Sequence, residues 1–276
     1  MENHHHLTDN SFFQPLSQFF QWLGRGFIQL ILSMGHISIF FGKSFCLIFS
    51  LPIQWSKIMY QIYFIGFKSI VVVCLTAAFT GMVLGLQGYY TLVKFGSEGL
   101  LGSAVALSLI RELGPVLTAI MIIGRAGSSM AAEIGIMRIS DQIDALKTMN
   151  INAKRFLVSP RIVASIASFP LLTAIFDVIG IAGGYLTGVI LLGINPAIYI
   201  NSMEHSVIMD DITGGFLKSF VFSLVVSTIC CYQGYYTHLR SDGFGAKGVS
   251  ISTTTAVVKS CILVLIADYI LTSFLL

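Results

Sequence analysis

The strongest constraint on this chain is a set of five apolar segments, each long enough to cross a lipid bilayer. A membrane-spanning helix needs about 20 mainly apolar residues. The segments cover roughly residues 64–86, 103–124, 162–192, 214–236 and 253–275. Only 11% of the residues are charged, against about 25% in an ordinary soluble domain, so charged groups are too few to cover a water-facing surface. The sequence therefore predicts an all-α membrane protein with five transmembrane helices.

The N-terminal part has a different character. The stretch 12–55 is rich in Phe, Ile and Leu, but scattered basic residues and Pro52 interrupt it. Aromatic residues mixed with basic ones are typical of an amphipathic helix that lies in the membrane interface. A sixth, poorly formed span is the alternative. We therefore divide the chain into residues 1–58, a tail with an interfacial helix, and residues 59–276, the membrane domain.

Lysine and arginine are unevenly shared among the loops between the spans. The loops 125–161 and 237–250 carry them, the loop 193–213 has none, and the loop 87–102 has only Lys94. Because basic loops stay on the cytoplasmic side of a membrane, the first two are expected to face the cytoplasm. An odd number of spans then places the N-terminus in the cytoplasm and the C-terminus outside it.

Glycines recur at helix-packing spacing in two spans. Gly81 and Gly85 form one pair, and Gly180, Gly184 and Gly188 form a longer ladder. Such faces let helix backbones approach closely in lipid. The pattern predicts tight helix packing and leaves open whether it occurs within one chain or between two.

Charged residues inside the spans indicate a polar site. Each costs about 2.5–3.5 kcal/mol at the bilayer centre on insertion scales. In the second span Arg111 and Glu112 precede Pro115, which frees the carbonyl of Arg111 from its helical bond and predicts a kink. Neighbours on a helix point about 100° apart, so these two charges should have different partners. Lys218 and Asp268 lie in the outer parts of the fourth and fifth spans, and Lys218 is expected to pair with Glu112 or Asp268.

Two interpretations of these charges stay open: an ion pair that holds three helices together, and the polar lining of an outward-facing cavity for a charged headgroup. Weaker candidates inside the spans are Asp177 and Lys259.

The basic loop between the second and third spans contains a candidate docking helix at about 133–149. Its apolar residues recur at three- and four-residue steps and form one face; they are Ile136, Ile139, Ile143 and Leu146. Its polar candidates are Glu133, Arg138, Asp141, Asp144 and Lys147. Mixed charge favours a protein partner, such as a soluble ATPase, over a helix resting on the membrane surface.

Several function classes find little support in the sequence. A phosphate-binding GxxxxGK[ST] loop fails because Ile37 stands at its first position, so ATP would have to be hydrolysed by another chain. No His/Cys cluster suggests a metal site, and a net charge of +3 is too small to indicate nucleic-acid binding. An intramembrane enzyme would need cooperating groups, yet His205 and His238 fall on opposite sides of the membrane. An ion-coupled secondary transporter remains the main alternative, although no inverted repeat supports it.

Several long motifs resemble one family of membrane proteins. They are GMVLGLQGY at 81–89, ALSLIRELGP at 106–115, GRAGS at 124–128, AEIG at 132–135 and DQIDAL at 141–146. In this order they resemble the MlaE/YrbE family of ABC transporter permeases, from about residue 60 to the C-terminus.

The resemblance implies a permease homodimer in the inner membrane that binds no cofactor itself. It also implies two cytoplasmic ABC ATPase subunits that use ATP and Mg²⁺, a periplasmic ring of MCE-domain proteins and a small STAS-domain protein. Such systems move phospholipids between the inner and outer membranes. The family's coupling helix maps onto about 133–149. Its cavity residues map onto Leu84, Leu92, Arg111, Glu112, Lys218 and Asp268. Phe95 stands where a well-known member has an outward-facing tyrosine.

Overall fold

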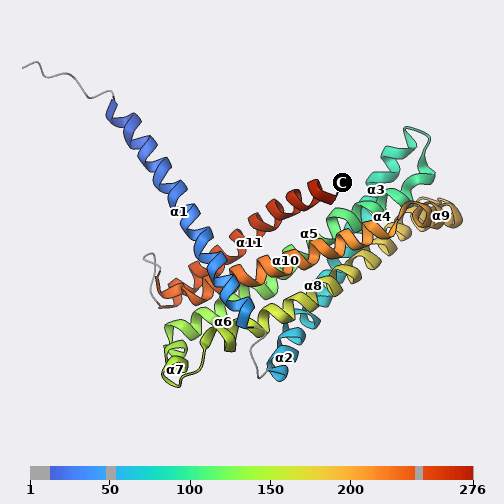
Figure 1. The fold of residues 1–276 in the computed structure, drawn as a ribbon. Helices are drawn as coiled ribbons and strands as arrows, with labels where there is room; N and C mark the ends of the chain where they lie inside the picture. The colour runs from blue at the N-terminus through green and yellow to red at the C-terminus, as the bar shows by residue number, and fades with distance from the viewer. Residues whose placement is uncertain (1–12, 48–53, 240–244, 276) are drawn as a thin grey trace, which may run out of the picture. The chain divides into compact units, whose positions relative to one another are not determined.

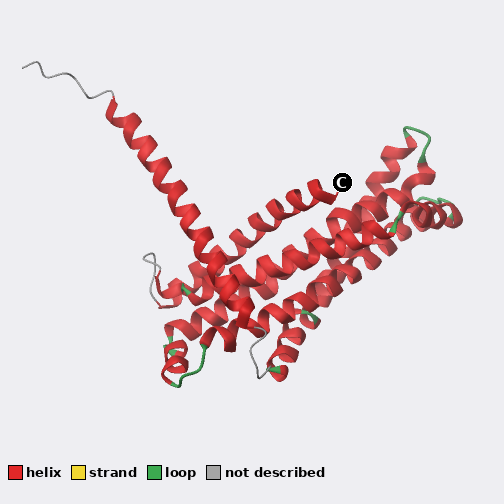
Figure 2. Cartoon of the chain, in the orientation of Figure 1, coloured by secondary structure: helices red, strands yellow, loops and turns green. Residues whose placement is uncertain are grey.

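The computed structural model describes residues 13–47, 54–239 and 245–275, and every regular element in these ranges is a helix (Figures 1 and 2). The chain forms two compact units, Met1–Lys43 and Ser44–Leu276. The division falls earlier than the predicted domain boundary after residue 58.

The first unit holds most of α1 (Phe13–Cys46), a helix of 34 residues. A helix is what the Phe-, Ile- and Leu-rich sequence predicts for this region. Its most apolar part, Ile31–Cys46, is shorter than a membrane span. The predicted location in the membrane interface stays a prediction, and Pro52 lies outside the described residues.

The second unit contains five helical spans that are long and apolar enough to cross a membrane. They cover Trp55–Val93, Glu98–Ile139, Ala153–Leu191, Met209–Tyr235 and Gly245–Leu275. Each matches one of the five predicted segments, so the predicted all-α membrane fold is confirmed.

The first two spans are each built from helices joined end to end, and one long helix forms most or all of each of the other three. These are α2 (Trp55–Ile65) with α3 (Ile70–Val93), α4 (Leu101–Ser108) with α5 (Gly114–Ile122) and α6 (Ser128–Ile139), then α8 (Ala153–Tyr185), α10 (Met209–Tyr235) and α11 (Gly245–Leu275). Two short helices lie in the connections, α7 (Gln142–Thr148) and α9 (Pro196–Ser206). Single turns of 3₁₀-helix lie at η2 (Phe67–Ser69), η3 (Glu98–Leu100) and η7 (Thr237–Leu239).

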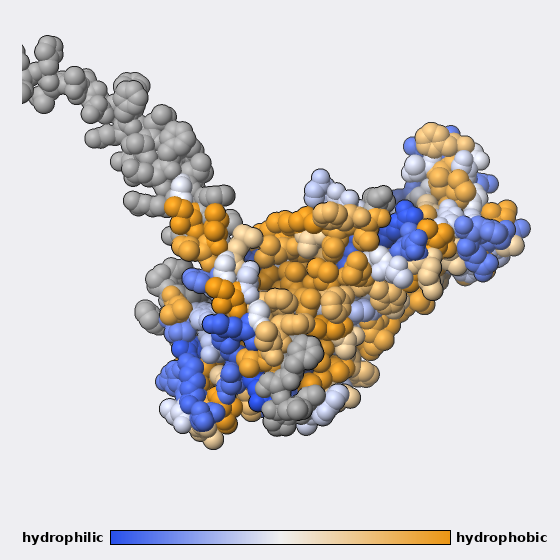
Figure 3. Space-filling model, viewed as in Figure 1, coloured by the Kyte–Doolittle hydropathy of each residue, from blue (hydrophilic) through white to orange (hydrophobic). Residues whose placement is uncertain are grey.

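Helix α3 illustrates how the sequence sorts lipid-facing from core positions. Val71, Leu75 and Phe79 recur every four residues and are exposed, whereas Val73 and Ala77 on another face are fully buried. Figure 3 shows the same division on the surface of this unit: apolar residues cover its middle, and hydrophilic residues gather near α7 and near α9. An apolar middle between polar ends is the pattern of a multi-pass membrane protein.

Among the described residues, three π-helical segments lie within the long spans. They are η4 (Leu109–Leu113), η5 (Ile123–Gly127) and η6 (Leu186–Leu191). Segment η4 ends two residues before Pro115, which lacks a backbone N–H and cannot continue the α-helical pattern to Arg111. The predicted distortion of the second span is therefore present, as a π segment.

The glycine faces pack α3 against α8 within one chain. A Cβ at Gly81 would overlap the backbone carbonyl of Gly180, and a Cβ at Gly85 would lie 3.1 Å from that of Gly184. Gly188 packs against Leu101 and the ring of Tyr199, where a Cβ would come within 2.9 Å of the leucine. The ladder therefore serves helix packing inside the chain.

The predicted single helix at 133–149 is instead two helices with a sharp bend between them. Helix α6 continues the second span as far as Ile139, and α7 begins at Gln142. Between them Asp141 has a left-handed backbone, with φ of 57°. The bend removes the expected common apolar face, because Ile143 is fully buried whereas Ile136 is 53% exposed.

Candidate functional site

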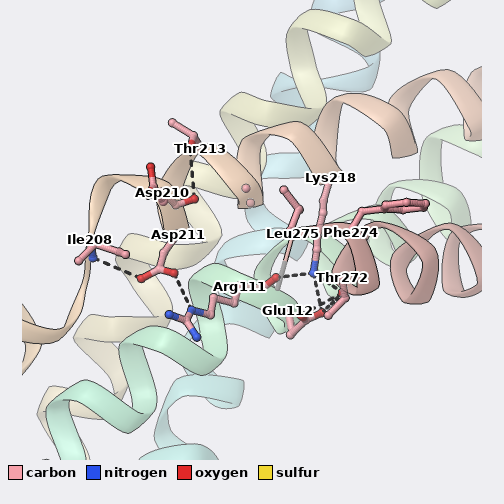
Figure 4. Close-up of a pocket in the computed structure, with 12 residues that line it drawn as sticks. Arg111, Glu112, Ile208, Asp210, Asp211, Thr213, Lys218, Thr272, Phe274 and Leu275 are labelled. Atoms are coloured by element: carbon pink, nitrogen blue, oxygen red, sulfur yellow. Dashed lines mark hydrogen bonds and ion pairs between the residues drawn. The ribbon is translucent and has the colours of Figure 1, made fainter.

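Charged residues of the second and fourth spans meet beside the end of the fifth span in one pocket of about 480 Å³. It lies among η4, the first turns of α10 and the last turns of α11 (Figure 4). Arg111, Glu112, Asp211, Lys218 and Thr272 line it, so three segments far apart in the sequence supply its polar groups.

Lys218 is the centre of this ionic pocket. Its ammonium nitrogen lies 2.8 Å from Glu112 Oε2 and 3.5 Å from Asp268 Oδ1. It also donates to the hydroxyl of Thr272 at 2.7 Å, and this hydroxyl donates onward to Glu112 Oε1 at 3.1 Å. Since Lys218 is only 3% exposed, these partners replace the water that its charge would otherwise need.

The backbone carbonyl of Arg111 is another acceptor for Lys218, at 2.8 Å. This is the carbonyl that Pro115 is expected to free, because proline cannot donate to it. A single proline thus distorts the second span and exposes a backbone acceptor at the point where the buried cation needs one.

Arg111 pairs with a different carboxylate, as its position beside Glu112 predicts. Its Nε lies 2.6 Å from Asp211 Oδ1. Asp211 is largely buried, and its second oxygen accepts from the backbone N–H of Ile208 at 3.3 Å, just before α10 begins. The Arg111 side chain is 41% exposed, so its guanidinium is the cation of the pocket that an incoming ligand reaches most readily.

The structure brings Arg111, Glu112, Lys218 and Asp268 together, as the sequence predicts, and it adds Asp211 and Thr272. Thr272 lies one turn after Asp268 on the same helix face, which the spacing of four residues could have revealed. The predicted cavity residues Leu84 and Leu92 pack against the hydrophobic core and do not line this pocket. Phe95 is 77% exposed, beyond the end of α3.

Replacing Asp211 tests the part of the pocket around Arg111. Asp211→Ala removes the acceptors of both Arg111 and the Ile208 amide, so we expect the free energy of unfolding to fall by about 1–2 kcal/mol. Asp211→Asn keeps an oxygen for the amide and should cost less. Thermal unfolding of the purified protein measures both, with the exposed neighbour Asp210→Ala as the matched control. Equal melting temperatures for the three variants would contradict this assignment.

A second ionic cluster surrounds the bend between α6 and α7. Arg138 and Lys147 each lie 2.8 Å from Asp144 Oδ1, and Arg138 also donates to His238 Nδ1 at 2.7 Å. The hydrogen bonds from Lys147 and Arg138 hold the pKa of Asp144 below its usual range. Burial, and then the charge of Arg138, lower the pKa of His238, so its ring is neutral at pH 7.

Four of the five residues predicted to dock a partner are therefore engaged within this chain. Arg138, Asp144 and Lys147 form the cluster at the bend, and Glu133 lies 2.9 Å from Arg161. Asp141, the fifth, is exposed, as is Lys147. Because Arg138 joins α6, α7 and η7, the bend is fixed to the connection between α10 and α11.

Comparisons with known proteins agree with the arrangement of spans and motifs. A family profile described as "Permease MlaE" matches residues 58–274. A "Probable ABC transporter permease protein" of Rickettsia bellii is 44% identical over 91% of this chain and 95% of its own length. The "Intermembrane phospholipid transport system permease protein MlaE" of Haemophilus influenzae is 41% identical over 78% of this chain and 81% of its own.

A plant protein is also similar in sequence to this chain. "Protein TRIGALACTOSYLDIACYLGLYCEROL 1, chloroplastic" of Arabidopsis thaliana is 37% identical over 80% of this chain and 62% of its own length. The profile covers all five spans and the motifs around the ionic pocket, and the bacterial relatives align over most of both chains. The chain is a multi-pass membrane protein that belongs to the MlaE permease family.

Proposed function

We propose that this chain is the permease subunit of an ABC transporter that moves phospholipids between the inner and outer membranes, driven by ATP hydrolysis in a separate subunit. The observation that carries the proposal is the ionic pocket among η4, the start of α10 and the end of α11. The name of the Haemophilus influenzae relative, which specifies intermembrane phospholipid transport, supports the choice of substrate.

The pocket offers complementary groups to a phospholipid headgroup. The half-exposed guanidinium of Arg111 is placed to meet a phosphate, since arginine binds phosphate oxygens through a planar fork of donors. Glu112, which is 40% exposed, is placed to accept from an ammonium group. The acyl chains would lie along apolar helix faces, which include Leu84 and Leu92. In this arrangement Lys218 holds the three helices together, and Arg111 and Glu112 contact the headgroup.

Transport would require the ATPase to change the packing of the spans. Closure of the ATPase pair would push α7 and the exposed Asp141, and the Arg138 cluster would pass that movement to α10 and α11, which carry Lys218 and Asp268. Only packing with two discrete arrangements can transmit such a push. The close glycine contacts of α3 and α8 provide a smooth surface for such a shift.

The proposal extends to the assembly and its orientation. The chain would act as a homodimer in the inner membrane, with the N-terminus in the cytoplasm and the C-terminus in the periplasm. Cytoplasmic ABC ATPase subunits would bind ATP and Mg²⁺, a periplasmic MCE-domain protein would receive or deliver lipid, and a STAS-domain protein would bind the ATPase. The basic loop 125–161 and the loop 193–213, which lacks Lys and Arg, support this orientation.

A pull-down tests the proposed assembly. The tagged chain is extracted from its native membrane in mild detergent, and mass spectrometry identifies the proteins and lipids that come with it. We expect an ABC ATPase, an MCE-domain protein and phospholipid. If the chain comes down alone and without lipid, the proposal fails and an ion-coupled transporter becomes the reading to test.

A charge swap separates docking from internal structure at the bend. Asp144→Arg places a third cation beside Arg138 and Lys147, and we expect it to abolish copurification of the ATPase. The double variant Arg138→Asp, Asp144→Arg restores an internal ion pair with reversed polarity. If the double variant restores folding at the bend but not ATPase binding, the ATPase contacts the charges of residues 138 and 144 directly. Normal ATPase copurification with the single variant would contradict the docking role.

A further inference from the structure

A second pocket, of about 190 Å³, opens between α8 and α10. Its walls are mainly apolar and include Ile181, Ile212 and Phe216, but one carboxyl group, that of Asp177, also lines it. Asp177 lies inside the third span, where an ionisable side chain is costly unless it has a partner or a function.

No described residue bonds to the buried oxygen of this carboxyl. Asp177 Oδ1 is buried without a hydrogen-bond partner among the described residues. The hydroxyl of Thr173, one turn earlier on α8, is already 3.0 Å from that of Ser219. Arg111 and Lys218, two cations of the spans, are bonded to other carboxylates. The second oxygen of Asp177 is not buried, so a donor from another molecule can reach this carboxyl from the pocket that the side chain lines.

The fold makes specific room for this carboxyl. A Cβ at Gly114 would overlap Asp177 Oδ1, so the absence of a side chain at Gly114 is what lets the carboxyl sit there. Gly114 follows η4, the same distorted segment that shapes the ionic pocket.

This pocket is separate from the ionic pocket. Ile212 and Phe216 line it, whereas Asp211, Gly215 and Lys218 line the other. At about 100° per residue these two sets fall on different faces of α10. A ligand in one pocket need not contact the other.

We propose that the Asp177 pocket binds an amphiphile whose apolar body carries an N–H or O–H donor, with the carboxyl of Asp177 as the acceptor. The apolar walls suit methylene groups, and the lone carboxyl suits a donor. A carboxylate repels a phosphate, so the bound polar group is an ammonium or a hydroxyl. The ammonium would come from an aminolipid headgroup, and the hydroxyl from a neutral lipid alcohol.

The test uses photoreactive probes that share one diazirine-bearing alkyl chain and differ only at the polar end. The ends are a primary ammonium, a hydroxyl and a trimethylammonium group, which is cationic but donates no hydrogen bond. The purified full-length chain is labelled, digested, and the labelled peptides are identified by mass spectrometry. We expect the ammonium probe, the hydroxyl probe or both to label peptides of the pocket at least tenfold more than the trimethylammonium probe.

Variants at Asp177 identify which donor is bound. Asp177→Asn keeps the shape and an acceptor oxygen but removes the charge, so it should lose labelling by the ammonium probe and keep labelling by the hydroxyl probe. Asp177→Leu should lose both. Exposed Glu204→Gln is the control and should change nothing. Because a carboxyl without a partner is removed, both Asp177 variants should melt at or above the wild-type temperature.

Labelling of the pocket that is equal in the wild type and Asp177→Leu would overturn the proposal. So would equal labelling by the ammonium, hydroxyl and trimethylammonium probes. Should Asp177→Leu fail to fold, the comparison of Asp177→Asn with the wild type across the three probes decides alone. The assay needs neither ATP nor transport, so its failure leaves the permease function untouched.

Discussion

Replacement of Lys218 by methionine is expected to be among the most damaging single changes in this protein. Methionine has a similar length and apolar character but removes the cation that Glu112 and Asp268 share, at 2.8 and 3.5 Å. It also leaves the carbonyl of Arg111 without its donor. Loss of one partner from a buried ion pair costs about 3–5 kcal/mol. Because Glu112 is half-exposed and solvent can partly stabilise its charge, we expect the loss in free energy of unfolding to lie near the lower end of that range.

Thermal or denaturant unfolding of the purified protein measures this loss, with exposed Lys94→Met as the matched control. A double-mutant cycle with Glu112→Gln gives the coupling between the two side chains. If the pair is as close as the structure shows, Glu112→Gln should cost much less in the Lys218→Met background than alone. Strict additivity of the two changes, or a Lys218→Met protein as stable as the control, would contradict the network.

Replacement of Gly81 by alanine should also be strongly destabilising, although it adds only one methyl group. The new Cβ would overlap the backbone carbonyl of Gly180, and a backbone atom inside α8 cannot move aside as a flexible side chain can. Overpacking of this kind costs about 1–3 kcal/mol. The two helices would have to separate along the whole face that Gly85 and Gly184 share.

Gly124→Ala provides the contrast, because a Cβ at Gly124 meets nothing within 4 Å. That change should be neutral or stabilise the helix by up to about 1 kcal/mol, since alanine has the higher helix propensity. Size-exclusion profiles and melting temperatures of the two variants give the comparison. A Gly81→Ala protein that melts with Gly124→Ala would show that α3 and α8 do not pack through these glycines.

The spans and the core of the ionic pocket were predictable because both follow from the cost of polar groups in lipid. Long apolar runs must become helices, and charges within them must find partners. That reasoning predicts Lys218 beside Glu112 or Asp268, and Pro115 points to the free carbonyl of Arg111. It misses Asp211 because this residue lies at the start of α10, where an acidic side chain is ordinary on a helix N-terminus.

Two features of the structure could not be predicted from sequence periodicity. The apolar spacing of residues 136–146 continues across Asp141 and so predicts one helix, whereas the left-handed backbone at that residue splits it. Aspartate tolerates this conformation better than most residues, but its presence does not require it. Likewise, glycine spacing identifies a packing face and not its partner, so the contact of Gly81 with Gly180 emerges only from the fold.

We propose that the ionic pocket handles phospholipid under the control of ATP hydrolysis in a partner subunit. The most direct measurement is ATP-dependent transfer of headgroup-labelled phospholipid by the copurified complex in proteoliposomes, with wild type and Arg111→Ala compared at equal protein content. We expect transfer to stop when the ATPase cannot hydrolyse ATP, and to fall at least tenfold in Arg111→Ala while the complex stays assembled. Transfer that continues without ATP hydrolysis, or that is unchanged in Arg111→Ala, would contradict it.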